Sequence, residues 1–214
     1  MEEDIAIIDK NTRNEKIKNF FINNKKQLII SISVIIFIIF GYFAYGDFQD
    51  GKRNKIAERY NSATINFITG DKTNVKSELI EIINKKDTAY SPLALYFIID
   101  NKIESTNEEI NQYFDVLINE VKLDEEIKNL IIFKKGLYNS DFTTENNLIS
   151  ILNPLINSGS VWKSHAFYLM AEYFFSNGQK QKAKEFYNQI ISLENSNENI
   201  KLEAQKKLIR DFGE

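Results

Sequence analysis

The chain contains 214 residues, which suits one ordinary domain with a small appendage and excludes a large multidomain enzyme. It has no cysteine, one histidine and two prolines, so disulfides, thiol chemistry, Cys/His zinc sites and histidine-based catalytic triads are excluded. The 27 Lys and Arg residues nearly balance the 30 Asp and Glu residues, and the resulting net charge of -3 argues against a nucleic-acid-binding protein.

A short polar tail, residues 1–26, precedes the first long apolar stretch. The tail has the pattern of a short amphipathic helix, with a capping-box sequence at residues 12–15. Its apolar residues are Ile5, Ile8, Ile17, Phe20 and Phe21. The tail is either a solvated cytoplasmic stub or a docking helix that lies on the membrane or on a partner.

Residues 27–46 contain no charged residue and predict a transmembrane helix. A helix of this length spans roughly 30 Å, the thickness of the hydrocarbon core of a bilayer. The alternative is a buried helix of a soluble protein, but such helices rarely run so far without a charge. A cleaved signal peptide fits poorly, because its apolar stretch would be shorter and a site with small residues would follow it. We therefore expect a retained anchor.

The flanking charges predict how this helix is oriented. Lys25 and Lys26 abut its start, whereas residues 47–51 after it contain no basic residue. Because basic residues are enriched on the cytoplasmic side of a membrane, we expect a cytoplasmic N-terminus and an extracytoplasmic C-terminal domain. Gly46 and Gly51 bracket residues 47–51, which we expect to form a flexible linker.

Residues 52–214 predict an all-α domain of nine helices, because helical periodicity recurs and no run alternates apolar and polar residues as a strand would. Grouped in pairs, the helices start near residues 52, 89, 123 and 161, and a single helix spans residues 197–212. These spacings of 37, 34 and 38 residues approach the 34-residue period of tetratricopeptide repeats. A short helix pair cannot bury its apolar face alone, so stacked pairs closed by a polar-faced last helix predict an α-solenoid.

The last pair, residues 164–195, resembles a tetratricopeptide repeat almost position by position. The matching residues are Ala166, Phe167, Met170, Ala171, Phe174, Gly178, Ala183, Tyr187 and Leu193. Two helices approach closely where Ala171 and Ala183 are small, and the bulky Phe174 fills the space beside them. The chain departs from the family at Ile190, where the family has alanine, and at Asn195, where it has proline. The first three pairs match the repeat weakly.

A second stripe of residues on the first helix of this pair is a candidate partner-binding groove. It consists of His165, Tyr168, Glu172, Phe175 and Ser176. In the repeat family the corresponding positions face the concave groove. The alternative is that Tyr168 and Phe175 pack against the terminal helix. We expect the lone His165 to be structural or to lie at the edge of the groove.

The sequence predicts no catalytic, cofactor-binding or metal-binding residue. It contains no Gly-rich phosphate loop, no H-E-x-x-H and no G-x-S-x-G motif. A metal site would need carboxylate ligands alone, and no EF-hand spacing is present. We therefore expect a protein that is not an enzyme and that uses no cofactor.

The whole architecture resembles one bacterial family. A charged tail, one span and a degenerate repeat domain that closes with LNPL at residues 152–155 and VWKSHA at residues 161–166 are similar to the YfgM-type ancillary subunit of the SecYEG translocon. The resemblance implies a scaffold in the inner membrane with a periplasmic domain, bound beside the translocon and cooperating with a membrane-anchored chaperone on secreted chains. The partners it implies are the bilayer, SecYEG and a periplasmic chaperone, without nucleic acid or a small-molecule substrate.

Two other function classes remain open. The same solenoid suits a tetratricopeptide-repeat scaffold in cell division or cell-wall assembly, because a fold does not determine function. The second and more remote alternative is an enzyme of an unrecognised class.

Overall fold

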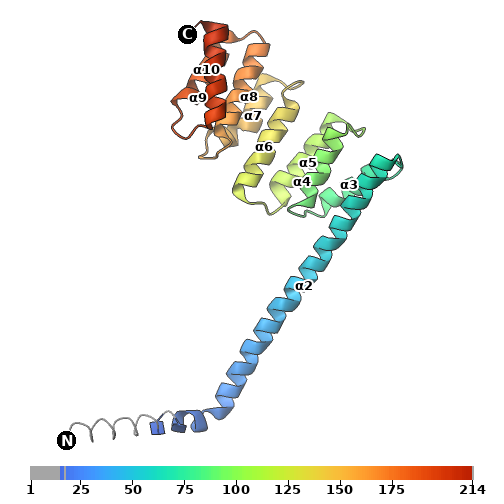
Figure 1. Cartoon of the computed structure of the whole chain (residues 1–214), viewed down its shortest axis with the longest axis vertical. Coiled ribbons are helices and arrows are strands. Elements are labelled where there is room, and N and C mark those ends of the chain that lie inside the picture. Colours follow the sequence, from blue (N-terminus) through green and yellow to red (C-terminus); the bar gives the residue numbers. More distant parts are fainter. Residues whose placement is uncertain (1–14, 17, 214) are drawn as a thin grey trace, which may run out of the picture. The chain divides into compact units, whose positions relative to one another are not determined.

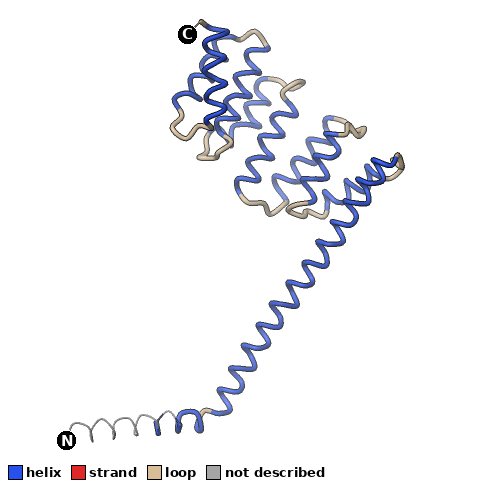
Figure 2. The backbone as a smooth tube through the Cα atoms, viewed as in Figure 1, coloured by secondary structure: helices blue, strands red, loops and turns tan. Residues whose placement is uncertain are grey.

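The computed structural model describes residues 15, 16 and 18–213, and all regular secondary structure in them is helical (Figure 2). The expectation of an all-α protein is therefore confirmed for this part of the chain. Of the expected tail helix, residues 15–16 and 18–23 are helical, whereas Ile5, Ile8, Ile17 and residues 12–14 of the capping box lie outside the described residues. The chain divides into two compact units, Met1–Lys55 and Ile56–Glu214.

The long helix α2 (Lys25–Thr69) begins in the first unit and ends in the second. Its segment Lys25–Phe43 is long and apolar enough to cross a membrane, and none of this segment is buried in the structure. Large apolar side chains here are freely exposed, for example Phe37 at 78% and Phe40 at 69%. By length and composition this helix suits a membrane anchor or a signal sequence, at the position where the sequence predicts a span.

The linker expected at residues 47–51 is helical instead. The helix α2 runs without a break through Gly46 and Gly51, and the boundary between the units falls after Lys55. A glycine inside a helix costs only about 1 kcal/mol relative to alanine, so a helix that continues on both sides tolerates it. Two isolated glycines were therefore too weak a signal for a break in this helix.

The second unit is a repeat-like array in which helices pack in sequential order (Figure 1). After the end of α2 it contains α3 (Val75–Asn84), α4 (Tyr90–Asp100), α5 (Asn107–Glu120), α6 (Glu125–Asn139), α7 (Glu145–Ile156), α8 (Lys163–Ser176), α9 (Lys180–Ser192) and α10 (Glu198–Phe212). The helix starts expected near residues 89, 123, 161 and 197 lie one or two residues before α4, α6, α8 and α10. The most extensive packing joins α3 to α4, α6 to α7, α8 to α9 and α9 to α10.

Local hydrogen bonds determine where these helices begin and end. At α5, Glu109 N donates to Thr106 Oγ1 at 3.1 Å, and Thr106 N donates to Glu109 Oε2 at 2.8 Å, which forms a complete capping box. At α6, the side chain of Asp124 accepts from Glu126 N. Gly178 has a φ of 75°, a left-handed conformation that glycine adopts without strain, and it makes the turn between α8 and α9.

The core of the second unit consists of two hydrophobic clusters that meet at α6. The buried residues of the first are Ala63, Val75, Leu79, Ile82, Ile83, Ala94, Leu95, Ile98, Ile110, Phe114, Leu117, Val121 and Ile131. Those of the second are Ile132, Leu148, Leu152, Leu155, Ala166, Phe167, Leu169, Met170, Ala171, Phe174, Ala183, Tyr187, Ile190, Ala204 and Leu208. The consecutive residues Ile131 and Ile132 thus belong to different clusters, and Ile118 of α5 packs against both.

Candidate partner-binding surface

Much of the stripe expected to line a groove on α8 is covered by the neighbouring helices. Its five residues are His165, Tyr168, Glu172, Phe175 and Ser176. All except Ser176 are half-buried. The ring centroid of Phe175 lies 6.0 Å from that of Phe212 on α10, and the ring centroid of Tyr168 lies 5.9 Å from that of Tyr187 on α9. The contact of Phe175 is thus with the terminal helix α10, as the alternative predicts, whereas the ring contact of Tyr168 is with α9.

Glu172 joins α8 to both helices that follow it. The hydroxyl of Tyr187 on α9 donates to Glu172 Oε1, and Nζ of Lys207 on α10 lies 2.7 Å from the same oxygen. Burial, and then the hydrogen bond to Glu172, raise the pKa of Tyr187, so this hydroxyl stays protonated as a donor. The carboxylate of Glu172 is therefore already engaged inside the last three helices.

His165 belongs to an aromatic cluster rather than to a proton-transfer site. Its ring centroid lies 5.0 Å from that of Trp162 and 5.7 Å from that of Phe133 on α6, and these two rings stack on each other. Burial lowers the pKa of His165, so the imidazole is neutral at pH 7. Its Nδ1 atom has no hydrogen-bond partner among the described residues. The cluster joins α6 to the start of α8 at the surface of the array.

The outer face of α6 carries an exposed apolar stripe. Ile127 and Leu137 are 46% and 49% exposed, and the half-buried Leu130 lies between them with the exposed Lys134. These four residues recur at intervals of three or four along the helix and so share one face. On α4 the apolar Leu93 is also exposed, at 44%.

A hollow of about 180 Å³ lies between α4 and α6, and we call it the α4–α6 groove. It is lined by Tyr96, Ile99, Asp100, Phe114, Lys134, Leu137 and Tyr138. Pockets for drug-sized ligands measure roughly 300–1,000 Å³, so this hollow suits a single large side chain of a partner better than a free ligand. Its lining is mainly apolar and aromatic, with one base and one acid at its edges.

The hydroxyl of Tyr96 is a polar group that the fold leaves without a partner. Its oxygen is inaccessible to solvent and has no hydrogen-bond partner within the described part of the chain. Lys134 Nζ lies 4.9 Å from the centroid of the Tyr96 ring, and burial raises the pKa of Tyr96 to about 12. An unsatisfied buried hydroxyl costs about 1–3 kcal/mol.

Sequence reasoning missed the α4–α6 groove. The stripe of Ile127, Leu130, Lys134 and Leu137 has helical spacing, but Ile131 and Ile132 beside it make α6 apolar on most sides. Periodicity alone therefore could not separate the outer stripe from the buried one. The unpartnered Tyr96 hydroxyl had no sequence signal, because it results from how α4 and α6 pack.

Neither metal chemistry nor a known relative assigns a function to these surfaces. Across residues 15–16 and 18–213, no group of three or more His, Asp or Glu side chains is placed to hold a metal ion. Comparisons of the chain with family models, with curated proteins and with solved structures found no match. The chain is an all-helical protein with one N-terminal apolar helix and a repeat-like helical array.

Proposed function

We propose that the protein is a non-enzymatic adaptor, anchored in a membrane by α2, whose helical array binds a segment of a partner protein in the α4–α6 groove. The observation that carries the proposal is this groove, a mainly apolar and aromatic hollow in which Leu137 of α6 is 49% exposed. Contiguous exposed apolar surface in a folded protein usually marks a site of interaction.

The exposure of the first part of α2 supports the membrane anchor. Burying one large apolar side chain in an apolar environment stabilises it by about 1.5–3 kcal/mol, and this segment exposes many of them to its surroundings. Tyr42, Phe43 and Tyr45 lie at its C-terminal end, where aromatic rings favour the membrane–water interface. Lys25 and Lys26 flank its start, as in an anchor with a cytoplasmic N-terminus.

For the setting of this adaptor, we propose the inner membrane of a bacterium, with residues 47–214 in the periplasm. The resemblance of residues 152–155 and 161–166 to the YfgM-type subunit supports a place beside the SecYEG translocon, together with a periplasmic chaperone. A scaffold in cell division or cell-wall assembly is the second candidate, because the same groove would serve either.

Site-specific photocrosslinking tests the groove and the partner together. A photoreactive amino acid replaces Leu137 in the groove or, as the control, the exposed Gln189 on α9, and full-length protein is irradiated in membranes. We expect cross-linked products from position 137 that are absent from position 189, with translocon subunits or a periplasmic chaperone among them. Products that contain only division or cell-wall proteins would favour the second candidate, and equal products from both positions would rule out the groove.

Co-purification provides an independent test. Leu137→Asp should reduce recovery of the partner at least about tenfold, because an acid in an apolar contact remains desolvated and unpaired. Gln189→Asp, which adds the same charge to another exposed site, should leave recovery unchanged. Replacement of residues 1–46 by an unrelated anchor should reduce recovery of the translocon if that segment contributes contacts within the membrane.

A further inference from the structure

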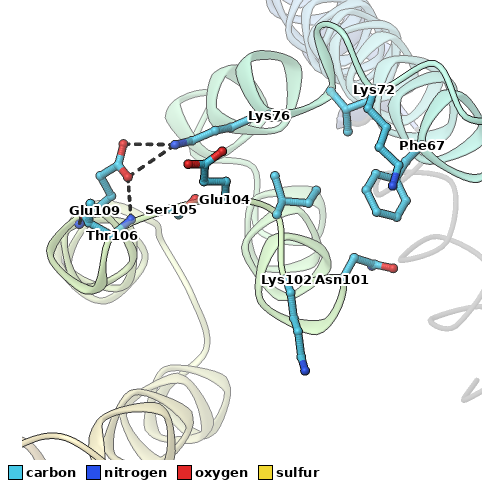
Figure 3. Close-up of a pocket in the computed structure, with 11 residues that line it drawn as sticks. Phe67, Lys72, Lys76, Asn101, Lys102, Glu104, Ser105, Thr106 and Glu109 are labelled. Atoms are coloured by element: carbon cyan, nitrogen blue, oxygen red, sulfur yellow. Dashed lines mark hydrogen bonds and ion pairs between the residues drawn. The ribbon is translucent and has the colours of Figure 1, made fainter.

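A second cleft, of about 770 Å³, lies between the start of α3 and the loop that joins α4 to α5 (Figure 3). It is lined by Phe67, Lys72, Val75, Lys76, Asn101, Lys102, Ile103, Glu104, Ser105, Thr106 and Glu109. Its size is in the range of sites that enclose a ligand or a short peptide segment. The lining residues differ from those of the α4–α6 groove, so this cleft is a separate site.

Two charged groups at one end of the cleft, Lys76 and Glu109, already pair with each other. Lys76 Nζ lies 3.2 Å and 3.4 Å from the two carboxylate oxygens of Glu109, and Glu109 also caps α5 through Thr106. Figure 3 shows Glu104 beside Lys76 at this same end. Lys76 and Glu109 thus pair with each other and join α3 to α5, whereas Glu104 forms no ion pair with a base of the described residues.

The other end of the cleft is basic and lies beside an apolar surface. Lys72 Nζ lies 4.5 Å from the centroid of the Phe67 ring, and Lys102 also lines the cleft, with its side chain directed away from Phe67 in Figure 3. Neither lysine forms an ion pair with any carboxylate of the described residues. The buried Val75, together with Phe67 and Ile103, forms the apolar part of the lining. An occupant that carries both an acid and an apolar group would match this end.

Lys102 occupies a backbone conformation that favours glycine, which suggests that its side chain has a role. Lys102 has a φ of 51° at the end of α4, in the left-handed region that favours glycine. Lys86, at the end of α3, has a φ of 56°, but its Nζ forms an ion pair with Glu120 Oε2 at 2.6 Å. The lysine at position 86 is thus explained by a contact within the fold, whereas no such contact explains the lysine at position 102.

We propose that this cleft binds an acidic, apolar peptide segment of a partner protein. An apolar side chain of the segment packs on Phe67 and Val75, and one or two of its carboxylates lie against Lys72 and Lys102. Opposite charges across an interface contribute specificity and speed association.

Direct binding of three peptides to the full-length protein in neutral detergent micelles tests this proposal. The first labelled peptide alternates leucine with glutamate, the second replaces each glutamate by lysine, and the third replaces each leucine by serine. We expect fluorescence anisotropy to show binding of the first peptide only, with an affinity that falls as salt concentration rises, because salt screens exposed charges. Equal binding of the lysine peptide, or an affinity independent of salt, would overturn the proposal.

Two matched variants separate loss of binding from loss of folding. Lys102→Gly removes the charge and suits the left-handed backbone, so the protein should fold as well as the wild type while its affinity for the glutamate peptide falls about tenfold. Lys86→Gly makes the same change at an equivalent backbone position outside the cleft and should leave affinity unchanged. If both variants bind as the wild type does, the cleft is not the binding site. Melting curves of both variants confirm that the comparison is between folded proteins.

Discussion

Gly136 on α6 lies directly against Leu152 on α7. A Cβ atom at position 136 would stand 2.5 Å from Cδ2 of Leu152 and 3.1 Å from its Cγ. Leu152 is fully buried, so its side chain has little room to move away. The absence of a side chain at position 136 is therefore what allows these two helices to approach so closely.

Gly136→Ala should destabilise the domain by up to about 2 kcal/mol. Alanine favours a helix by about 1 kcal/mol over glycine, but overpacking a core costs about 1–3 kcal/mol. Gly51→Ala is the matched control, because Gly51 is also helical and no atom lies within 4 Å of its added Cβ. Chemical denaturation measures both variants. A Gly136→Ala protein as stable as the wild type would show that α6 and α7 adjust without cost.

Ala183→Leu should destabilise the domain by about 1–3 kcal/mol. Ala183 is fully buried where α9 packs on α8, and three extra carbons would force neighbouring side chains out of their preferred rotamers. Gln189→Leu, an exposed position on the same helix, should change the melting temperature little. If the two variants melt alike, the packing of α8 on α9 is looser than these residues indicate.

The domain should lose stability as the pH rises from about 10 to about 12. Burial raises the pKa of Tyr96 and of Tyr168 to about 12, compared with about 10 in the unfolded chain. Between these values the folded state retains protons that the unfolded state loses, so the free energy of unfolding falls with rising pH. In Tyr96→Phe this decline should be shallower, whereas an identical decline would contradict the role of Tyr96.

Single cysteines test the proposed topology, because the chain contains no native cysteine. Asn146→Cys, at an exposed position in α7, should react with an impermeant maleimide applied outside spheroplasts, whereas Asn19→Cys should react only after lysis. Asn139 would be a poor labelling site, since it is 5% exposed and exchanges hydrogen bonds with Asn111. Labelling of position 19 alone in intact spheroplasts would reverse the orientation.

The helices of the second unit were predictable because their ends have strong local signals. Asp124 caps α6, and Gly178 takes a left-handed conformation between α8 and α9, so the residue types themselves determined these boundaries. Gly46 and Gly51 do not stand at a positive φ, and both lie inside the helix α2. A glycine thus marks a turn only where the backbone requires one.

The candidate surfaces were less predictable than the helices, because they depend on how helices pack. The sequence pattern on α8 allowed Tyr168 and Phe175 to contact either a partner or the terminal helix. The structure places Phe175 against Phe212 of the terminal helix and Tyr168 against Tyr187 of α9. The orphan hydroxyl of Tyr96 depends on atoms far apart in the sequence. Such features can be identified only once the tertiary structure is known.

The division of the core at Ile131 and Ile132 bears on the order in which the chain acquires its structure. Because Ile131 is the last buried residue of the first cluster, that cluster can close before α7 to α10 have left the ribosome. The later helices then add to an existing surface one after another. In the folded protein, the same division allows the C-terminal helices to open transiently while the earlier helices of the second unit stay folded.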